Sequence, residues 1–232
     1  MKSFKTMYAT LFSYSDNKSF ISTLRQKRLD KLKKHLHSFA KQKKGKVQIL
    51  DIGGSYTFWK QSGFLSSDQF YITLMNLNAP KLPDNAIGFS SIQGNACSLN
   101  FSCNEYDIAF SNSVIEHVGT QKEQEMMACS IRDKFDHYIV QTPNFWFPFD
   151  PHSQILLFQF IPHPIRAIII CFCGNIHWFP KKNTYKECLN VSKSIKMLSK
   201  SKFSILFPDA TILTERLWGI PKSFTAIKGF DH

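Results

Sequence analysis

Short apolar runs alternate with segments of helical period from residue 46 onward. The short runs predict buried β-strands, and apolar positions recurring every three to four residues predict helices. The predicted strands are Val47–Ile52, Phe70–Met75, Gly88–Gln93, Tyr106–Ser111, His137–Thr142, Phe203–Phe207 and Phe224–Lys228. The predicted helices are Thr57–Leu65, Lys122–Lys134 and residues 183–202. This alternation predicts an α/β fold with a mostly parallel seven-stranded sheet and helices on both faces.

The segment before the first strand has a helical stripe of its own. Its apolar positions are Leu24, Leu29, Leu32, Leu36 and Phe39, and Lys and Arg occupy most of the rest. We favour a helix that packs on the domain with a solvated basic face; the alternative is an arm that binds anionic lipid or nucleic acid. The chain therefore divides into a basic N-terminal helical arm, residues 1–45, and a domain, residues 46–232.

The positive charge of the chain is concentrated in that arm. Residues 1–46 carry 13 Lys or Arg and two acids, whereas the remaining 186 residues carry 16 Lys or Arg and 15 acids. A nearly neutral body argues against a domain built throughout to hold nucleic acid. A basic arm is compatible with contact to an anionic membrane surface.

The six cysteines form no CxxC pair, so we predict reduced, mostly buried thiols and no metal site. The sequence contains no run of about 18 uncharged apolar residues, so we predict no transmembrane helix. The apolar piece at the start is too short and too polar for a secretory signal. These features predict a cytoplasmic protein, with peripheral membrane association as an option.

The stretch "KVQILDIGGSYTFWK" places an acid and two glycines at the end of the first strand. In open α/β sheets, ligands bind at the carboxyl ends of the strands, where strand order reverses. Glycine lets the backbone turn tightly and approach a ligand. A dinucleotide fingerprint, G-x-G-x-x-G, fails at Ser55 and Phe58, and no Walker loop is present.

This stretch resembles motif I of the class I S-adenosylmethionine-dependent methyltransferases, an acid-x-Gly-x-Gly pattern in which Ser55 replaces the second glycine. "GNACSLNFSCNEYDIAFSNSVIEHV" is similar to the same family's G-D-A, loop, strand and S-N-x-x-x-E-H sequence. The closing "WGIPKSFTAIKG" is similar to its last hairpin strand. The resemblance, closest to type 11-like members, implies a Rossmann-like class I methyltransferase fold with S-adenosyl-L-methionine as cofactor.

The resemblance also implies a cofactor site at the carboxyl ends of the strands. Asp51 would lie near the methionine amino group, and the glycine turn would let the main chain pass close to the ligand. The full set of implied cofactor residues is Asp51, Gly53, Gly54, Ser55, Asn76, Asn95, Ala96, Ser111 and Asn112. Asn76 and Asn95 stand where the family usually has acids, which leaves a non-catalytic binding module with the same fold as the alternative.

Candidate catalytic residues follow the fourth and fifth strands. Methyl transfer needs a base only if the acceptor atom carries a proton. Glu116, His117 and His152 are the candidates, with Asp150 beside the last of them. The competing interpretations are that Glu116 and His117 begin a helix and that His152 is a structural loop histidine.

The segment at about residues 145–182 is an apolar insert, rich in aromatic and aliphatic residues and interrupted by prolines. It predicts either a helical pair that covers the sheet or a lid over an apolar acceptor. We therefore expect O-methylation of a small-molecule or lipid-linked acceptor. A nucleic-acid methyltransferase is the less favoured alternative, because D/N-P-P-Y/F tetrads are absent.

Overall fold

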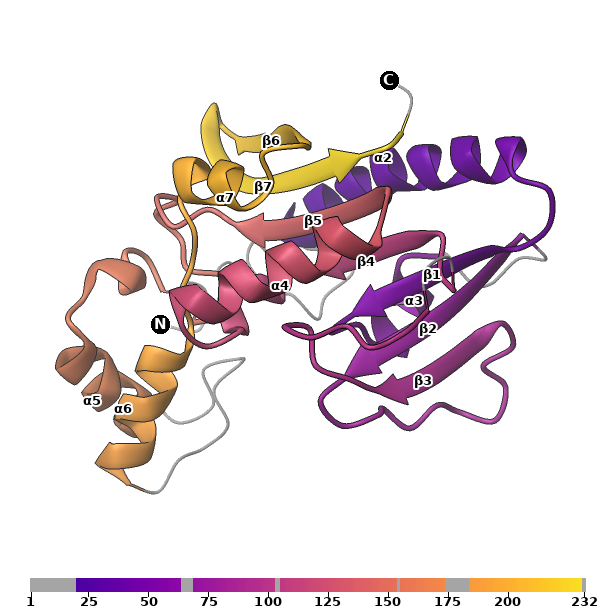
Figure 1. The fold of residues 1–232 in the computed structure, drawn as a ribbon. Helices are drawn as coiled ribbons and strands as arrows, with labels where there is room; N and C mark the ends of the chain where they lie inside the picture. The colour runs from indigo at the N-terminus through magenta and orange to yellow at the C-terminus, as the bar shows by residue number, and fades with distance from the viewer. Residues whose placement is uncertain (1–19, 64–68, 103–104, 154, 174–183, 231–232) are drawn as a thin grey trace.

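A seven-stranded sheet with the order β3-β2-β1-β4-β5-β7-β6 forms the centre of the computed structural model, which describes residues 20–63, 69–102, 105–153, 155–173 and 184–230 (Figure 1). β1 to β5 pair in parallel, and β7 is antiparallel to both β5 and β6. The predicted mostly parallel sheet is therefore confirmed. The strands are β1 Val47–Ile52, β2 Phe70–Asn76, β3 Phe89–Gln93, β4 Ile108–Asn112, β5 His137–Pro143, β6 Thr211–Leu217 and β7 Ile220–Lys228.

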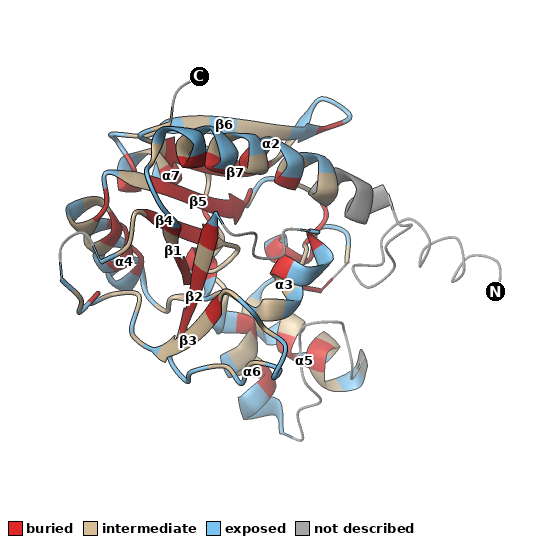
Figure 2. Ribbon diagram, turned by 90° about the vertical axis from the view of Figure 1, so that its right-hand side faces the viewer, coloured by how far each residue is buried: buried red, intermediate tan, exposed pale blue. Residues whose placement is uncertain are grey.

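Helices cover both faces of the sheet. Helices α2 (Phe20–Gln42) and α3 (Tyr56–Gln61) pack on one face, and α4 (Gln121–Lys134) and α7 (Lys200–Leu206) pack on the other. In Figure 2 the buried strands lie between these two helical layers. The basic helix α2 buries its leucine stripe against the sheet, since Leu29, Leu32 and Leu36 are almost inaccessible to solvent. Packing of the apolar face of this helix on the domain agrees with the interpretation that we favoured for the segment.

Strand order reverses between β1 and β4. The chain builds β1, β2 and β3 outward to one edge and then returns to place β4 on the other side of β1. The loops that leave β1 and β4 consequently diverge and open a crevice at the carboxyl ends of the strands. The fold thus places the glycine turn and the S-N-x-x-x-E-H segment at one end of the sheet.

The predicted strand Phe203–Phe207 is wrong. Most of these residues belong to α7, and the missing strand is β6. Phe203 and Phe207 lie four residues apart, so both point from one helical face into the core, where each is fully buried. β6 escaped prediction because it is an edge strand with few buried residues and no apolar run.

One helix of the apolar insert pairs with the helix that follows the insert in the chain. α5 (His163–Cys173) packs against α6 (Tyr185–Ser194) around a separate small core. The helix predicted over residues 183–202 is confirmed in part: the range holds α6 and the start of α7, and residues 195–199 separate the two helices. Figure 1 shows this pair beyond the ends toward which the parallel strands point.

A disulfide bond joins Cys171 of α5 to Cys188 of α6, with 5.9 Å between their Cα atoms. The prediction of reduced thiols is wrong for this pair, because the helical hairpin brings together two cysteines that lack a recognisable spacing in the sequence. Of the free cysteines in the described residues, Cys97 is half-buried and Cys129 is exposed. Cys103 lies outside the described residues.

Within the described part of the chain, none of the helices has both the length and the apolar character that a membrane span requires. Residues 1–19 of the predicted arm lie outside the described residues.

Candidate functional site

Asp51, the penultimate residue of β1, is a buried carboxylate with one oxygen unpaired among the described residues. Its side chain is 1% exposed, and its Oδ2 accepts a hydrogen bond of 2.6 Å from Nε1 of Trp59. Its Oδ1 has no hydrogen-bond partner among the described residues. Burial raises the pKa of Asp51 to about 7, although the Trp59 hydrogen bond acts in the opposite direction. A buried acceptor of this kind suits a ligand that carries a positive charge and N–H donors.

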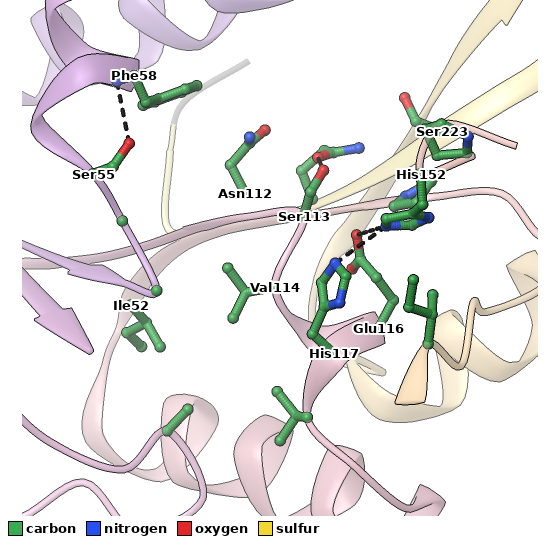
Figure 3. Close-up of a pocket in the computed structure, with 18 of the residues that line it drawn as sticks. Ile52, Ser55, Phe58, Asn112, Ser113, Val114, Glu116, His117, His152 and Ser223 are labelled. Carbon is green, nitrogen blue, oxygen red and sulfur yellow. Dashed lines mark hydrogen bonds and ion pairs between the residues drawn. The ribbon is translucent and has the colours of Figure 1, made fainter. Parts of the chain in front are cut away.

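The two glycines after Asp51 leave no room for a side chain. A Cβ on Gly53 would lie 2.5 Å from a methyl carbon of Val114, and the φ of Gly53 is +75°. A Cβ on Gly54 would lie 1.8 Å from Oδ2 of Asp51. Ser55 then caps α3, its Oγ accepting from the Phe58 backbone N–H at 3.3 Å (Figure 3). The turn therefore exposes its backbone to the space beside Asp51, as the sequence predicted for a close approach to a ligand.

Asn76 and Asn95 take part in local hydrogen bonds. Nδ2 of Asn76, at the end of β2, donates to the carbonyl of Gly54 at 2.9 Å and so braces the glycine turn. Oδ1 of Asn95, after β3, accepts from the backbone N–H of Cys97 at 2.9 Å. Asn95 and the neighbouring Ala96 border the same cavity as Asp51.

The two residues that end β4 have different surroundings. Ser111 is buried and donates from its Oγ to the carbonyl of Ile52 at 3.1 Å, so it joins β4 to β1 behind the cavity wall. Asn112 borders the cavity, and its Oδ1 accepts from Nη2 of Arg28 at 3.2 Å. Of these two predicted positions, the structure brings only Asn112 to the cavity surface.

Glu116, His117 and His152 converge at the far end of the crevice (Figure 3). The first two lie in the short 3-10 helix η1 (Ile115–His117), and His152 lies in the loop after β5. The two histidine Nε2 atoms are 3.1 Å apart, and Nε2 of His152 is 4.0 Å from Oε1 of Glu116. Glu116 and His117 lie in a short helix, as the competing interpretation expected, and both also line the cavity.

Buried partners fix the orientation of this cluster. Oε2 of Glu116 accepts from Oγ1 of Thr142 at 3.0 Å, whereas its Oε1 has no hydrogen-bond partner among the described residues. Nδ1 of His152 lies 3.2 Å from Oδ1 of Asp150. Burial raises the pKa of Glu116, and burial together with the neighbouring His152 lowers the pKa of His117 to about 4. His117 is therefore neutral near pH 7.

A single cavity of about 1380 Å³ connects the glycine turn with this cluster. Pockets for one small ligand are typically roughly 300–1,000 Å³, so this cavity has room for a cofactor and a second molecule. The predicted site residues that line it are Asp51, Gly53, Gly54, Ser55, Asn76, Asn95, Ala96, Asn112, Glu116, His117 and His152.

Arg28 is a cavity residue that the sequence did not reveal. It reaches from α2 into the cavity, with Nη1 3.2 Å from Oε2 of Glu215 on β6 and Nη2 bound to Asn112. In the sequence it is one of many basic residues in the arm, and both partners are distant along the chain. Only the packing of α2 on the sheet distinguishes it.

The sequence matches no protein-family model and no curated protein. Among solved structures, it is similar to the N-methyltransferase NodS from Bradyrhizobium japonicum in complex with S-adenosyl-L-homocysteine (TM-score 0.50, 10% identity, 98% of this chain and 96% of that chain covered). It is also similar to a cyclopropane-fatty-acyl-phospholipid synthase-like protein from Lactobacillus casei (0.50, 10%, 98% and 99%). A third similar structure is a protein from Pyrococcus horikoshii (0.50, 13%, 100% and 100%).

The chain has the Rossmann-like fold of methyltransferases, as the arrangement of its seven strands and covering helices indicates. The predicted fold class is thereby confirmed.

Proposed function

We propose that this protein is an S-adenosylmethionine-dependent methyltransferase that acts on a small-molecule or lipid-linked acceptor, at oxygen. The observation that carries the proposal is the buried Asp51 carboxylate, with an unpaired Oδ1, beside a glycine turn that has no room for side chains. A positively charged ligand with amino hydrogens would satisfy that oxygen. The solved methyltransferase of the same fold contains S-adenosyl-L-homocysteine, the demethylated form of this cofactor.

Different residues of the crevice would bind different parts of the cofactor. Asp51 would hold its methionine amino group, and Gly53 and Gly54 would admit it close to the backbone. Nδ2 of Asn76 binds the carbonyl of Gly54, and its Oδ1 would accept a hydrogen bond from a ribose hydroxyl. Asn95 and Ala96, which line the cavity, would lie beside the adenine base. Bound in this way, the cofactor supplies an electrophilic methyl group.

The acceptor would occupy the part of the cavity next to the His–Glu cluster. Phe147, Pro148, Phe149 and Leu156 of the insert line this cavity together with Val191 of α6. These apolar walls favour an acceptor with a hydrophobic body and exclude water from the reacting atoms. His117, neutral at pH 7, would take the proton of an acceptor hydroxyl as the methyl–sulfur bond breaks and the methyl–oxygen bond forms.

The first test is a calorimetric titration of the protein with S-adenosylmethionine and S-adenosylhomocysteine. We expect micromolar binding, weakened at least about tenfold by Asp51→Asn, a change equivalent to about 1.4 kcal/mol. Asparagine can still accept the Trp59 hydrogen bond, so the variant removes charge with little change of shape. Asp209→Asn is the matched control, because Asp209 binds Tyr138 and Lys228 away from the cavity.

Equal affinity of wild type and Asp51→Asn would refute the assigned cofactor position. No binding at millimolar cofactor would instead favour the non-catalytic binding module, since Asn76 and Asn95 would then have disabled the site.

A further inference from the structure

The Glu116, His117 and His152 cluster presents three potential metal-ligating atoms to one point. One ligand atom from each of the three residues lies within 4.8 Å of the other two. They come from two separate segments, η1 and the loop after β5, which the sheet holds together. In the sequence this grouping is invisible, because the ligands are not cysteines and His152 is far from Glu116 along the chain.

The spacing of the two imidazoles suits a shared ion. Two nitrogens bound to Zn²⁺ at about 2.0–2.1 Å in tetrahedral geometry lie about 3.3 Å apart. The Nε2 atoms of His117 and His152 are 3.1 Å apart. Oε1 of Glu116 is 4.0 Å from Nε2 of His152, and the three ligand atoms lie within 4.8 Å of one another, so a shift of up to about 1.5 Å by the carboxylate would complete the set.

Two further observations point to a ligand at this position. Glu116 is fully buried, yet its Oε1 has no hydrogen-bond partner among the described residues. Such an atom normally has a partner, because a buried unpaired carboxylate oxygen is costly. Asp150 contacts Nδ1 of His152 at 3.2 Å, which places a hydrogen on Nδ1 and leaves the Nε2 lone pair directed at the cluster. Carboxylates orient metal-ligating histidines in this same way.

We infer that Glu116, His117 and His152 form a binding site for a divalent transition-metal ion. Two imidazoles and one carboxylate favour Zn²⁺, Fe²⁺ or Mn²⁺ over Mg²⁺ and Ca²⁺, which prefer oxygen ligands. Three protein ligands leave at least one coordination position open, as in catalytic rather than structural sites. The cavity surrounds this open position, so a small molecule can reach it.

The role of the ion rests on the proposed function. An acceptor hydroxyl that fills the open position would have a lower pKa and would release its proton to water before methyl transfer. With the ion bound, His117 would act as a ligand and no longer as a base. The acceptor class then narrows to molecules with a hydroxyl exposed at the end of a hydrophobic body.

The site is tested with Zn²⁺ and Co²⁺ on protein stripped by chelator, from which any affinity tag has been removed. We expect one Zn²⁺ per chain in competition with a chromophoric chelator, and visible absorption bands from Co²⁺ in the same site. His117→Ala should weaken Zn²⁺ binding by more than about 100-fold, and Asp150→Asn by about 10- to 100-fold. His163→Gln is the matched control, because His163 on α5 lies outside the cluster.

His117→Ala keeps the test decisive, because His117 borders the cavity and belongs to none of the three buried hydrophobic clusters of the described residues. Wild type that binds no Zn²⁺, or that binds it as tightly as His117→Ala does, would overturn the inference.

Failure of the metal site and failure of the proposed function are distinguishable. Asp51→Asn should lose the cofactor and keep Zn²⁺, whereas His117→Ala should lose Zn²⁺ and keep the cofactor, measured in separate titrations. If the protein bound Zn²⁺ but not S-adenosylmethionine, the result would support the metal site and contradict the proposed methyltransferase function.

Discussion

Among single residues, Asp51 shows most directly how a functional group can oppose folding. Its carboxylate is almost completely removed from water but has only one hydrogen bond, from Trp59, in the described structure. Burial without compensation favours the protonated form, and the pKa rises to about 7. A neutral side chain of the same size would avoid the cost of burying this charge.

This pKa sets a pH dependence of stability with a definite sign. The folded-state pKa of about 7 exceeds the ordinary value of 3.8, so between these values the folded protein binds the proton and the unfolded chain does not. The stability that Asp51 contributes is complete below about pH 4 and is lost as the pH rises to about 7. Asp51→Asn should therefore raise the melting temperature of the ligand-free protein at about pH 8 by several degrees, with a smaller gain at about pH 5.

Thermal unfolding followed by circular dichroism across this pH range measures the difference. Asp209→Asn is the control with the opposite sign: burial alone would raise the pKa of Asp209, but hydrogen bonds from Tyr138 and Lys228 outweigh it and lower the pKa. That variant should be less stable than wild type at about pH 8. If Asp51→Asn were equally destabilised at both pH values, the carboxylate would have an unrecognised partner.

The cavity residues differ in how far the sequence could identify them. Asp51, Gly53 and Gly54 could be proposed from the sequence, because an acid and two glycines at the end of a buried strand form a local pattern, although the same pattern also suits a simple strand-to-helix turn. Arg28 could not be, because its two partners, Asn112 and Glu215, lie on strands that approach α2 only in the folded chain. The metal-ligand cluster escaped prediction for the same reason, although each of its members was a candidate base.

At the scale of elements, the accuracy of prediction followed burial. β1, β2, β4 and β5 are almost continuously buried, so their sequences read as apolar runs, and each was predicted within a residue or two. The edge strand β6 is mostly exposed, so its sequence lacks an apolar run. The short helix α7 contains several apolar residues close together, and for this reason we predicted a strand there instead of a helix. A short apolar run cannot distinguish a buried strand from one buried turn of helix.

The pairing of α5 with α6 gives a prediction about the Cys171–Cys188 disulfide. The bond spans 17 residues of sequence and crosses a small core that is separate from the two large ones. A crosslink over a loop of about this length contributes about 3 kcal/mol by restricting the unfolded chain. Replacing both cysteines by serine should increase hydrogen exchange in α5 and α6 by about 10- to 100-fold and leave the sheet amides unchanged.

Cys129→Ser is the control for that experiment, because Cys129 is a free, exposed thiol. Alkylation without reductant, read by mass spectrometry, should leave Cys171 and Cys188 unlabelled. Complete labelling of both would mean that the purified protein lacks the bond.

For the whole molecule, the position of the helical pair bears on where an apolar acceptor could enter. α6 contributes Val191 and Ser194 to the cavity wall, and α5 packs against α6 on the small core that they share. On α5, Ile165, Ile168 and Phe172 are 46–85% exposed and are spaced to lie on one helical face. An exposed apolar face of this kind favours contact with a hydrophobic surface.

Peripheral membrane binding is therefore the last prediction, with α5 as the contact. Exposed Lys186 and Lys193 on the neighbouring α6 supply positive charge, so anionic vesicles should bind better than neutral ones, and added salt should weaken the binding. Burying a Phe side chain contributes about 1.5–3 kcal/mol, so Phe172→Ser should reduce vesicle binding by about tenfold or more. Cosedimentation with phosphatidylcholine vesicles, with and without phosphatidylglycerol, measures both effects.

Ile205→Ser is the matched control, since Ile205 is 75% exposed but lies on α7, away from the helical pair. Equal losses in the two variants would exclude α5 as the docking face, and the acceptor would then have to reach the cavity through water.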